Sequence, residues 1–236
     1  MAISPEAFNA ADLQARFKQR CRETQDVYQN WQIRVHRSLS WLKRGLEFPE
    51  SEPEARFLYL WIALNSLYSC WDAEQNAPMK DSAARQRFLH WLCAKDSELI
   101  AQQLHRHRGL IKRLLGDPYL AAQFWRNPNH PKAKGWAAQD ANHLDQHLRA
   151  RAYDRLLEQT MDRLFILRGQ IVHGASTLGS RYNRSALSYA IRTLERFVPA
   201  FLHITIEHGC NDDWPEICYP PAPGTAPLSA RQNTHQ

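Results

Sequence analysis

Residues 56–68 read RFLYLWIALNSLY and are apolar on almost every side of the helix that they predict. One stripe steps mostly by three or four residues and holds Phe57, Leu60, Trp61, Leu64, Leu67, Tyr68 and Trp71. The other side carries Tyr59, Ile62, Ala63 and Cys70. A helix that is apolar all round belongs in the middle of a helical bundle. We therefore expect a central helix over about residues 54–73.

The segments on either side of this helix are also helical in pattern. Ser4-Pro5-Glu6 is typical of a helix start, and apolar residues from Leu13 onward, at spacings of mostly three or four, predict one long helix, or two collinear ones, that runs to about Leu46. The same spacing predicts another long helix over about 136–171 and a last one over about 184–208. Runs of β-branched residues that alternate with polar ones are missing. The predicted fold class is all-α, an up-and-down antiparallel helical bundle.

The chain reads as one helical domain with an insertion and a tail. Residues 1–208 are expected to form the domain, and about 77–138 an inserted helical segment with short helices. Asp117-Pro118 starts one of these by the usual preference for Asp as the helix N-cap and Pro just after it. Residues 209–236 contain PPAPGTAP, a composition that favours a disordered C-terminal tail.

Composition limits the cellular setting. The formal net charge of +6 and the pI near 9.2 favour an anionic partner. Five cysteines without a C-x-x-C pair are typical of reduced intracellular thiols. The N-terminus lacks the pattern of a signal peptide, and the most apolar run, residues 57–71, is shorter than a bilayer span. We expect a soluble cytoplasmic protein with no membrane partner.

A cation and an imidazole stand together near the end of the second long helix. Residues 164–175 read LFILRGQIVHGA and place Arg168 five residues before His173. The helix neighbours of Arg168 are all apolar: Leu164, Phe165, Ile171 and Val172. A guanidinium among such neighbours needs an anionic partner or a wet cleft. Gly174 then predicts the helix stop, because glycine readily takes the left-handed conformation that ends helices.

The same spacing occurs once more, in Arg85 and His90. Arg85 follows Asp81 and Ser82 by about one turn, which predicts an ordinary solvated setting, so we do not assign it a function. Five residues turn about 140° on a helix, so Arg168 and His173 do not stack on one face. They can share a site if the helix ends at His173. They can also do so if two copies face each other across a dimer axis.

The densest basic run is HRHRGLIKR, residues 105–113. Its permanent cations are Arg106, Arg108, Lys112 and Arg113. Short charged runs are common on solvated helix faces, and this interpretation stays open. A row of cations can also follow the phosphates of a nucleic acid, so these four residues are candidate binding residues.

Asn65 is a polar residue within the central helix. A buried amide must find hydrogen bonds, and the backbone of a neighbouring helix is the commoner partner. The alternative is that Asn65 orients Arg168 or His173 and so supports the site.

His143 and His147 lie one turn apart, a spacing that can bind a metal. No third ligand stands at a diagnostic distance, and no nucleotide-cofactor fingerprint is present. We expect neither a metal nor a cofactor.

The order of these elements resembles the HEPN superfamily, particularly its compact Apea-like members. The resemblance rests on RFLYLWIALNSLY, then a long helix ending in LRGQIVHGA, then a closing helix. It implies a homodimer whose R-x4-H motifs face each other across a cleft. Active members are metal-independent endoribonucleases of toxin–antitoxin, phage-defence and RNA-processing systems. Arg168 and His173 are then the catalytic pair, and a possible antitoxin or other regulatory protein is a partner.

The activity that the resemblance implies is RNA cleavage by transesterification. His173 would exchange a proton with the ribose 2′-OH or the leaving 5′ oxygen, and Arg168 would stabilise charge on the phosphate. The basic run would bind RNA. Active members often carry a polar residue after the arginine, where this chain has Gly169; Gln170 could supply an amide instead.

Two other interpretations stay open. The first is a non-catalytic HEPN module that binds RNA or nucleotides, or dimerises, through the same cleft. The second is structural: Arg168 pairs with a carboxylate and His173 caps its helix.

Overall fold

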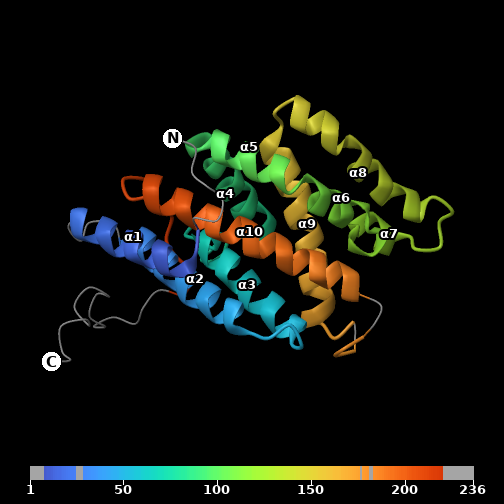
Figure 1. The fold of residues 1–236 in the computed structure, drawn as a ribbon, viewed down its shortest axis with the longest axis horizontal. Coiled ribbons are helices and arrows are strands. Elements are labelled where there is room, and N and C mark those ends of the chain that lie inside the picture. The colour runs from blue at the N-terminus through green and yellow to red at the C-terminus, as the bar shows by residue number, and fades with distance from the viewer. Residues whose placement is uncertain (1–7, 25–28, 176, 181–182, 220–236) are drawn as a thin grey trace.

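The computed structural model describes residues 8–24, 29–175, 177–180 and 183–219. These residues form an all-α bundle with one very short β-hairpin, which confirms the predicted fold class (Figure 1). The elements in chain order are α1 Ala10–Glu23, α2 Gln29–Glu47, α3 Pro53–Tyr68, β1 Trp71–Asp72, β2 Ala77–Pro78, α4 Asp81–Lys95, α5 Ser97–Arg106, α6 Arg108–Gly116, the 3-10 helix η1 Pro118–Leu120, α7 Ala122–Arg126, α8 Ala133–Arg149, α9 Tyr153–Val172 and α10 Arg184–His208. The last helix has the bounds that the sequence predicts.

α3 and α10 lie at the centre of the bundle. α10 lies between α1–α3 on one side and α5, α6 and α8 on the other (Figure 1). α3 packs mainly against α2 and α10, and Leu60 and Leu64 are fully buried, as predicted for a central helix. Truncating either leucine to alanine would cost about 2–5 kcal/mol. None of the helices in the described ranges combines the length and the apolar content that a membrane crossing needs.

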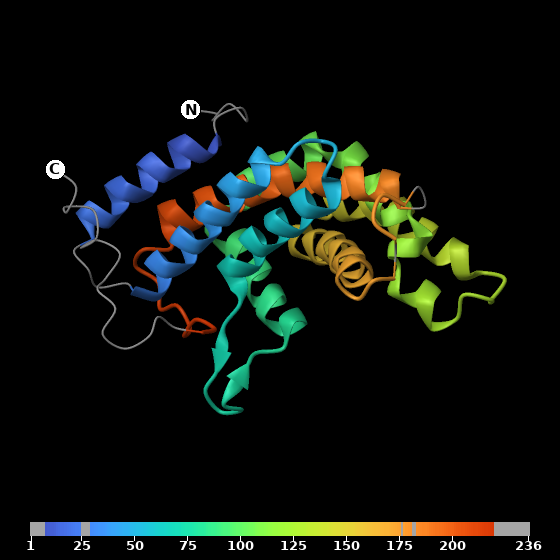
Figure 2. The ribbon, with the colours of Figure 1, turned by 90° about the horizontal axis from the view of Figure 1, so that it is seen from below.

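The first two helices are not collinear. α1 and α2 pack side by side, and the rings of Phe17 and Trp31 meet edge to face with centroids 5.5 Å apart (Figure 2). The prediction of one long helix or two collinear ones is therefore wrong. Apolar spacing describes each helix by itself, and it carries no information on how α1 and α2 pack against each other.

The long helix predicted over about 136–171 is also two helices. The chain leaves helical geometry at Arg151, whose φ is +54°, and α9 folds back against α8. Arg163 of α9 then pairs with Asp140 of α8 at 2.5 Å, and its side chain is only 4% exposed. The break has no glycine or proline to announce it. We attribute the end of the helix here to the packing of α8 on α9, since the local sequence carries no signal for it.

The first part of the predicted inserted segment, residues 77–138, belongs to the main core up to Leu120, and Ala121, Phe124, Ala133 and Ala137 form a small separate apolar cluster. Leu92, Ile100 and Leu114 are fully buried in the same apolar cluster as α3. Asp117 accepts a hydrogen bond from the Tyr119 N–H at 2.9 Å and starts η1, as predicted. That this segment is an insertion stays a prediction.

The first part of the predicted tail, residues 209–219, is packed against the bundle. The Trp71 N–H donates to the Glu216 carbonyl at 2.8 Å, and Ile217 and Cys218 are buried. Arg34 of α2 donates to the Pro215 carbonyl at 2.7 Å. The prediction of disorder is wrong for these residues, because α2 and β1 supply donors for their carbonyls. PPAPGTAP, residues 220–227, lies outside the described residues.

Candidate functional site

The last turn of α9 ends in a Schellman motif at the predicted stop. The Gly174 N–H donates to the Ile171 carbonyl at 3.2 Å, and the Ala175 N–H donates to the Gln170 carbonyl at 2.8 Å. Gly174 has φ +68°, in the left-handed region that glycine tolerates best. His173 is therefore the C-cap residue, so its ring lies where the helix opens to solvent.

Arg168 is partly buried and makes no hydrogen bond or ion pair with any described residue. Every other described arginine that is at least partly buried bonds a carboxylate or a main-chain carbonyl: Arg16, Arg20, Arg34, Arg37, Arg56, Arg85 and Arg163. A guanidinium in partial burial keeps its charge and is stabilised by an anion. The structural interpretation requires a carboxylate that pairs with Arg168, and no described residue supplies one.

His173 is exposed, and its ring makes no hydrogen bond, ion pair or ring contact within the described ranges. Its backbone caps α9, as the structural interpretation expects, but capping uses only the main chain. An accessible imidazole can move a proton, and an unpaired guanidinium can bind an anion. Whether the two side chains act on one substrate depends on their position about the helix, since five residues turn about 140°.

Gln170 connects the last turn of α9 to two exposed aromatic residues. Its amide Nε2 donates to the Tyr119 carbonyl at 2.8 Å, and the same carbonyl accepts from the Trp125 indole at 2.8 Å. Its Oε1 accepts from Asn183 at 2.9 Å, so both ends of this amide bond protein groups. Tyr119 and Trp125 are 42% and 52% exposed. Neither residue is predicted from the sequence, because the link to α9 runs through the Tyr119 carbonyl, 51 positions before Gln170 in the chain.

Asn65 does not bond to Arg168 or His173 in the described residues, and its partner is Asp81. Asn65 is partly buried, and its amide donates to Asp81 of α4 through a long hydrogen bond of 3.5 Å. The same carboxylate accepts from the Tyr68 hydroxyl at 2.7 Å. No hydrogen bond in the described residues joins Asn65 to Arg168 or His173.

Arg85 is buried, not solvated as its neighbours in sequence predict. Its side chain is 6% exposed and pairs with Asp81 at 2.6 Å and with Asp162 of α9. Its guanidinium also lies 5.3 Å from the centre of the Phe165 ring. The burial of Arg85 arises because the second carboxylate and the ring belong to α9, which packs on α4.

The candidate RNA-binding residues fall into two kinds. Arg108 pairs with Asp145 of α8, and Arg113 donates to the Tyr189 hydroxyl at 3.2 Å. Arg106 and Lys112 are exposed and have no polar partner in the described part of the chain. All four are exposed at the surface, and none is hydrogen-bonded to Arg168 or His173.

His143 and His147 lie on one face of α8 with ring centroids 6.4 Å apart. The described residues contain no group of three or more histidines, cysteines or carboxylates placed to hold a metal ion. Burial lowers the pKa of His147, and Arg155 lowers it further.

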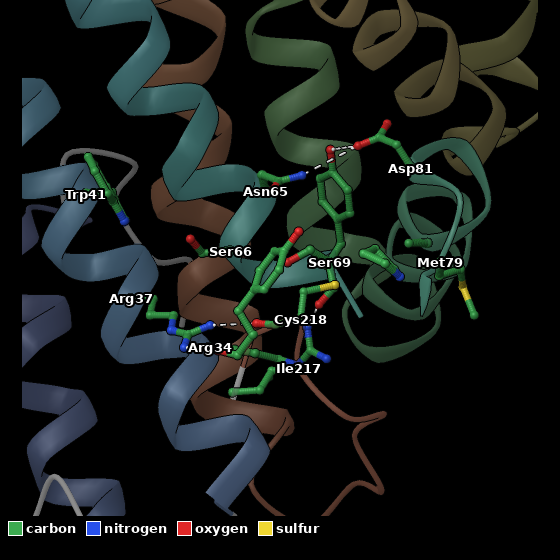
Figure 3. A pocket seen from close by; sticks show the side chains of 14 residues that line it. Arg34, Arg37, Trp41, Asn65, Ser66, Ser69, Met79, Asp81, Ile217 and Cys218 are labelled. Atoms are coloured by element: carbon green, nitrogen blue, oxygen red, sulfur yellow. Dashed lines mark hydrogen bonds between the residues drawn. The ribbon is translucent and has the colours of Figure 1, made fainter. Parts of the chain in front are cut away.

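Two hollows of the described surface lie away from Arg168 and His173. One, of about 430 Å³, is lined by α2, α3, the β-hairpin and residues 217–219 (Figure 3). A second, of about 500 Å³, lies between α4 and residues 211–215 and shares Arg34 with the first. Arg168 and His173 line neither of these two hollows.

Comparison of this chain with protein-family models, with curated proteins and with solved structures found no match. The residues themselves therefore carry the functional argument.

Proposed function

We propose that this protein is a metal-independent endoribonuclease of the HEPN type, acting in the cytoplasm as a toxin or phage-defence effector. The observation that carries the proposal is that Arg168, five residues before the exposed His173 on the same helix, is partly buried and has no hydrogen-bond or ion-pair partner in the described residues. Structural arginines in the described chain have protein acceptors, so an arginine without one is free to bind a phosphate. RNA supplies that phosphate in every linkage.

In this proposal the two residues have different roles. His173 takes the proton of the ribose 2′-OH, which then attacks the adjacent phosphorus, or it donates a proton to the leaving 5′ oxygen. Arg168 hydrogen-bonds the phosphate oxygens as negative charge develops on them. The products are a 2′,3′-cyclic phosphate and a free 5′-hydroxyl. DNA lacks the attacking group and is not cut.

We propose further that two copies form the site. Val172 and Leu178, which flank the helix stop, are 49% and 84% exposed, a large exposure for aliphatic side chains. An isologous two-fold contact through this end of α9 would cover them and bring the Arg168 of one copy toward the His173 of the other.

RNA would extend from this site over neighbouring surfaces. Tyr119 and Trp125 offer exposed rings on which bases can stack, typically worth about 1–3 kcal/mol per base. Arg106, Arg108, Lys112 and Arg113 offer cations for the phosphates further along. A regulatory protein that covers the end of α9 would act as the antitoxin.

The test is cleavage of a uniformly labelled single-stranded RNA by the purified chain in the presence of EDTA. We expect cleavage, products ending in a 2′,3′-cyclic phosphate, and no cutting of the DNA of the same sequence. The matched control is His173→Ala, which removes the imidazole but leaves the capping backbone in place. A strict Mg²⁺ requirement, or equal cutting of DNA, would exclude transesterification.

The second candidate function is a non-catalytic module that binds RNA or nucleotides through the same surface. Gly169 favours it, because it supplies no side chain beside Arg168, and both ends of the Gln170 amide bond other groups. A Cβ added at Gly169 would meet nothing within 4 Å, so Gly169→Asn fits sterically. RNA binding without cleavage by the wild type, with cleavage gained by Gly169→Asn, would establish this alternative.

A further inference from the structure

The hollow between α2, α3, the β-hairpin and residues 217–219 has charged groups at two ends. Figure 3 shows Arg34 and Arg37 near Cys218 at one end, and Asn65 and Asp81 at the other. Its volume of about 430 Å³ lies in the range of small-molecule sites. This hollow is separate from the end of α9, so its role is independent of the proposed RNA cleavage.

Arg34 is a buried cation without a carboxylate. The residue is 1% exposed, and its guanidinium donates only to main-chain carbonyls, Ser69 at 2.5 Å and Pro215 at 2.7 Å being the nearest. Its Nε is buried and has no acceptor among the described residues. Burial lowers the pKa of Arg34 to about 10, so the group stays protonated at neutral pH. Buried charges normally have an ionic partner.

Arg37 adds a second cation one turn along α2. It donates to the carbonyls of Cys218 at 3.1 Å and Tyr219 at 2.8 Å, which are again neutral acceptors. The carboxylate at the other end, Asp81, is already bonded to Arg85 and to the Tyr68 hydroxyl. Two adjacent guanidiniums therefore share this end of the hollow without a protein anion to balance them.

We propose that this hollow binds a small oxyanion group, a phosphate or a carboxylate, at Arg34 and Arg37. A charged oxygen makes shorter and stronger hydrogen bonds to a guanidinium than a carbonyl does, so the anion would replace the Tyr219 and Cys218 carbonyls on Arg37. The rest of the ligand would lie along Ser66 and Asn65 toward Asp81. Residues 217–219 would be held less tightly once their donors turn to the ligand.

The test is the binding of inorganic phosphate and of succinate, measured by calorimetry and by thermal unfolding against chloride at equal ionic strength. We expect wild type to bind at least one of the two anions, and the stronger one identifies the chemistry. Arg37→Gln should weaken that binding about tenfold or more, the size of one charge-assisted hydrogen bond. Arg44→Gln is the matched control: it removes a cation from the exposed side of the same helix, and binding should not change.

Ser66→Leu provides a second variant, which fills the hollow without changing charge and decides the case if Arg37→Gln does not fold. It should abolish binding in a folded protein. Failure of wild type to bind either anion at millimolar concentration overturns the proposal, as does wild-type affinity in folded Arg37→Gln or Ser66→Leu. Loss of binding in Arg168→Gln but not in Arg37→Gln would place the anion at the end of α9 and also overturn it.

Discussion

Arg85 and His90 in α4 repeat the spacing of Arg168 and His173 at the end of α9, but the surroundings of the two arginines differ. Arg85 is buried between the carboxylates of Asp81 and Asp162 and lies over an aromatic ring. Arg168 is partly buried and has no acceptor in the described chain. His90 and His173 are both exposed, and His90 lies 3.8 Å from a carboxylate of Asp154.

The difference shows what a short motif can and cannot report. One turn before it Arg85 has the polar residues Asp81 and Ser82, from which a solvated setting is predicted, whereas all the helix neighbours of Arg168 are apolar. The apolar Phe88 and Leu89, one turn after Arg85, lie in the core and agree with its burial. The decisive carboxylate, Asp162, comes 77 residues after Arg85 in the chain. An arginine already bonded to two carboxylates has little capacity for a phosphate, whereas an unbonded one keeps all its donors. The motif at the end of α9 is therefore the functional candidate.

The largest expected effect is on catalysis. Arg168→Ala and His173→Ala should each lower the rate of RNA cleavage by about 10²–10⁴-fold, the usual contribution of a general acid–base or charge-stabilising group. His90→Ala, the matched change at the other motif, should leave the rate unchanged. Initial rates on a labelled RNA measure this, with circular dichroism to confirm folding. Equal loss in His90→Ala would remove the distinction between the motifs.

A mixing experiment tests whether two copies share the site. If Arg168 and His173 act from different subunits, a heterodimer of Arg168→Ala with His173→Ala keeps one intact centre of two. Random exchange makes about half of the dimers mixed, so two inactive proteins should recover about a quarter of wild-type activity. No recovery, with subunit exchange shown by a fluorescent label, means that both residues act from one chain.

For stability we expect the reverse order: replacing Arg85 should have the larger effect and replacing Arg168 the smaller one. Arg85→Met removes the partner of two carboxylates, and we expect it to lower the free energy of unfolding by roughly 1–3 kcal/mol, because Asp162 is partly solvated. Arg168→Met removes no hydrogen bond or ion pair to a described residue and should change the free energy of unfolding by less than about 0.5 kcal/mol. Urea titration followed by circular dichroism gives both values. A large loss in Arg168→Met would reveal a structural role for this residue.

The smallest effect concerns the salt dependence of RNA binding. Arg106→Gln or Lys112→Gln should each reduce the log–log slope by about 0.7, the value for one phosphate contact on a single strand. Arg108→Gln should reduce it less, because Arg108 already pairs with Asp145 and must leave it to reach a phosphate. Titrations at several salt concentrations measure the slopes. Unchanged slopes in all three variants would identify this run as a solvated surface.

Much of the fold follows from the sequence. The bounds of α10, the central place of α3 and the start of η1 at Asp117 all agree with the prediction. The helix stop at Gly174 does so too. These features depend on apolar spacing within one helix, or on the backbone preferences of one or two residues. Arg168 and His173 could be singled out on the same local basis.

Other features depend on contacts between distant segments. The break at Arg151 has no glycine or proline beside it, and the packing of α1 on α2 depends on contacts such as that between the rings of Phe17 and Trp31. The packing of residues 209–219 depends on Arg34 and Arg37, more than 170 positions earlier, which donate to their carbonyls.

The sequence by itself determined which segments are helical, where several of them end, and that Arg168 stands among apolar neighbours. Tertiary structure decided which arginines have partners: it gave Arg85 a carboxylate from α9, gave Arg34 only carbonyls, and gave Arg168 none in the described chain. The physical reason is one of range. A helix repeats every 3.6 residues, so its sequence shows how apolar and polar residues are distributed over the faces of that one helix. Whether a buried charge is balanced depends on what the neighbouring helix brings to it.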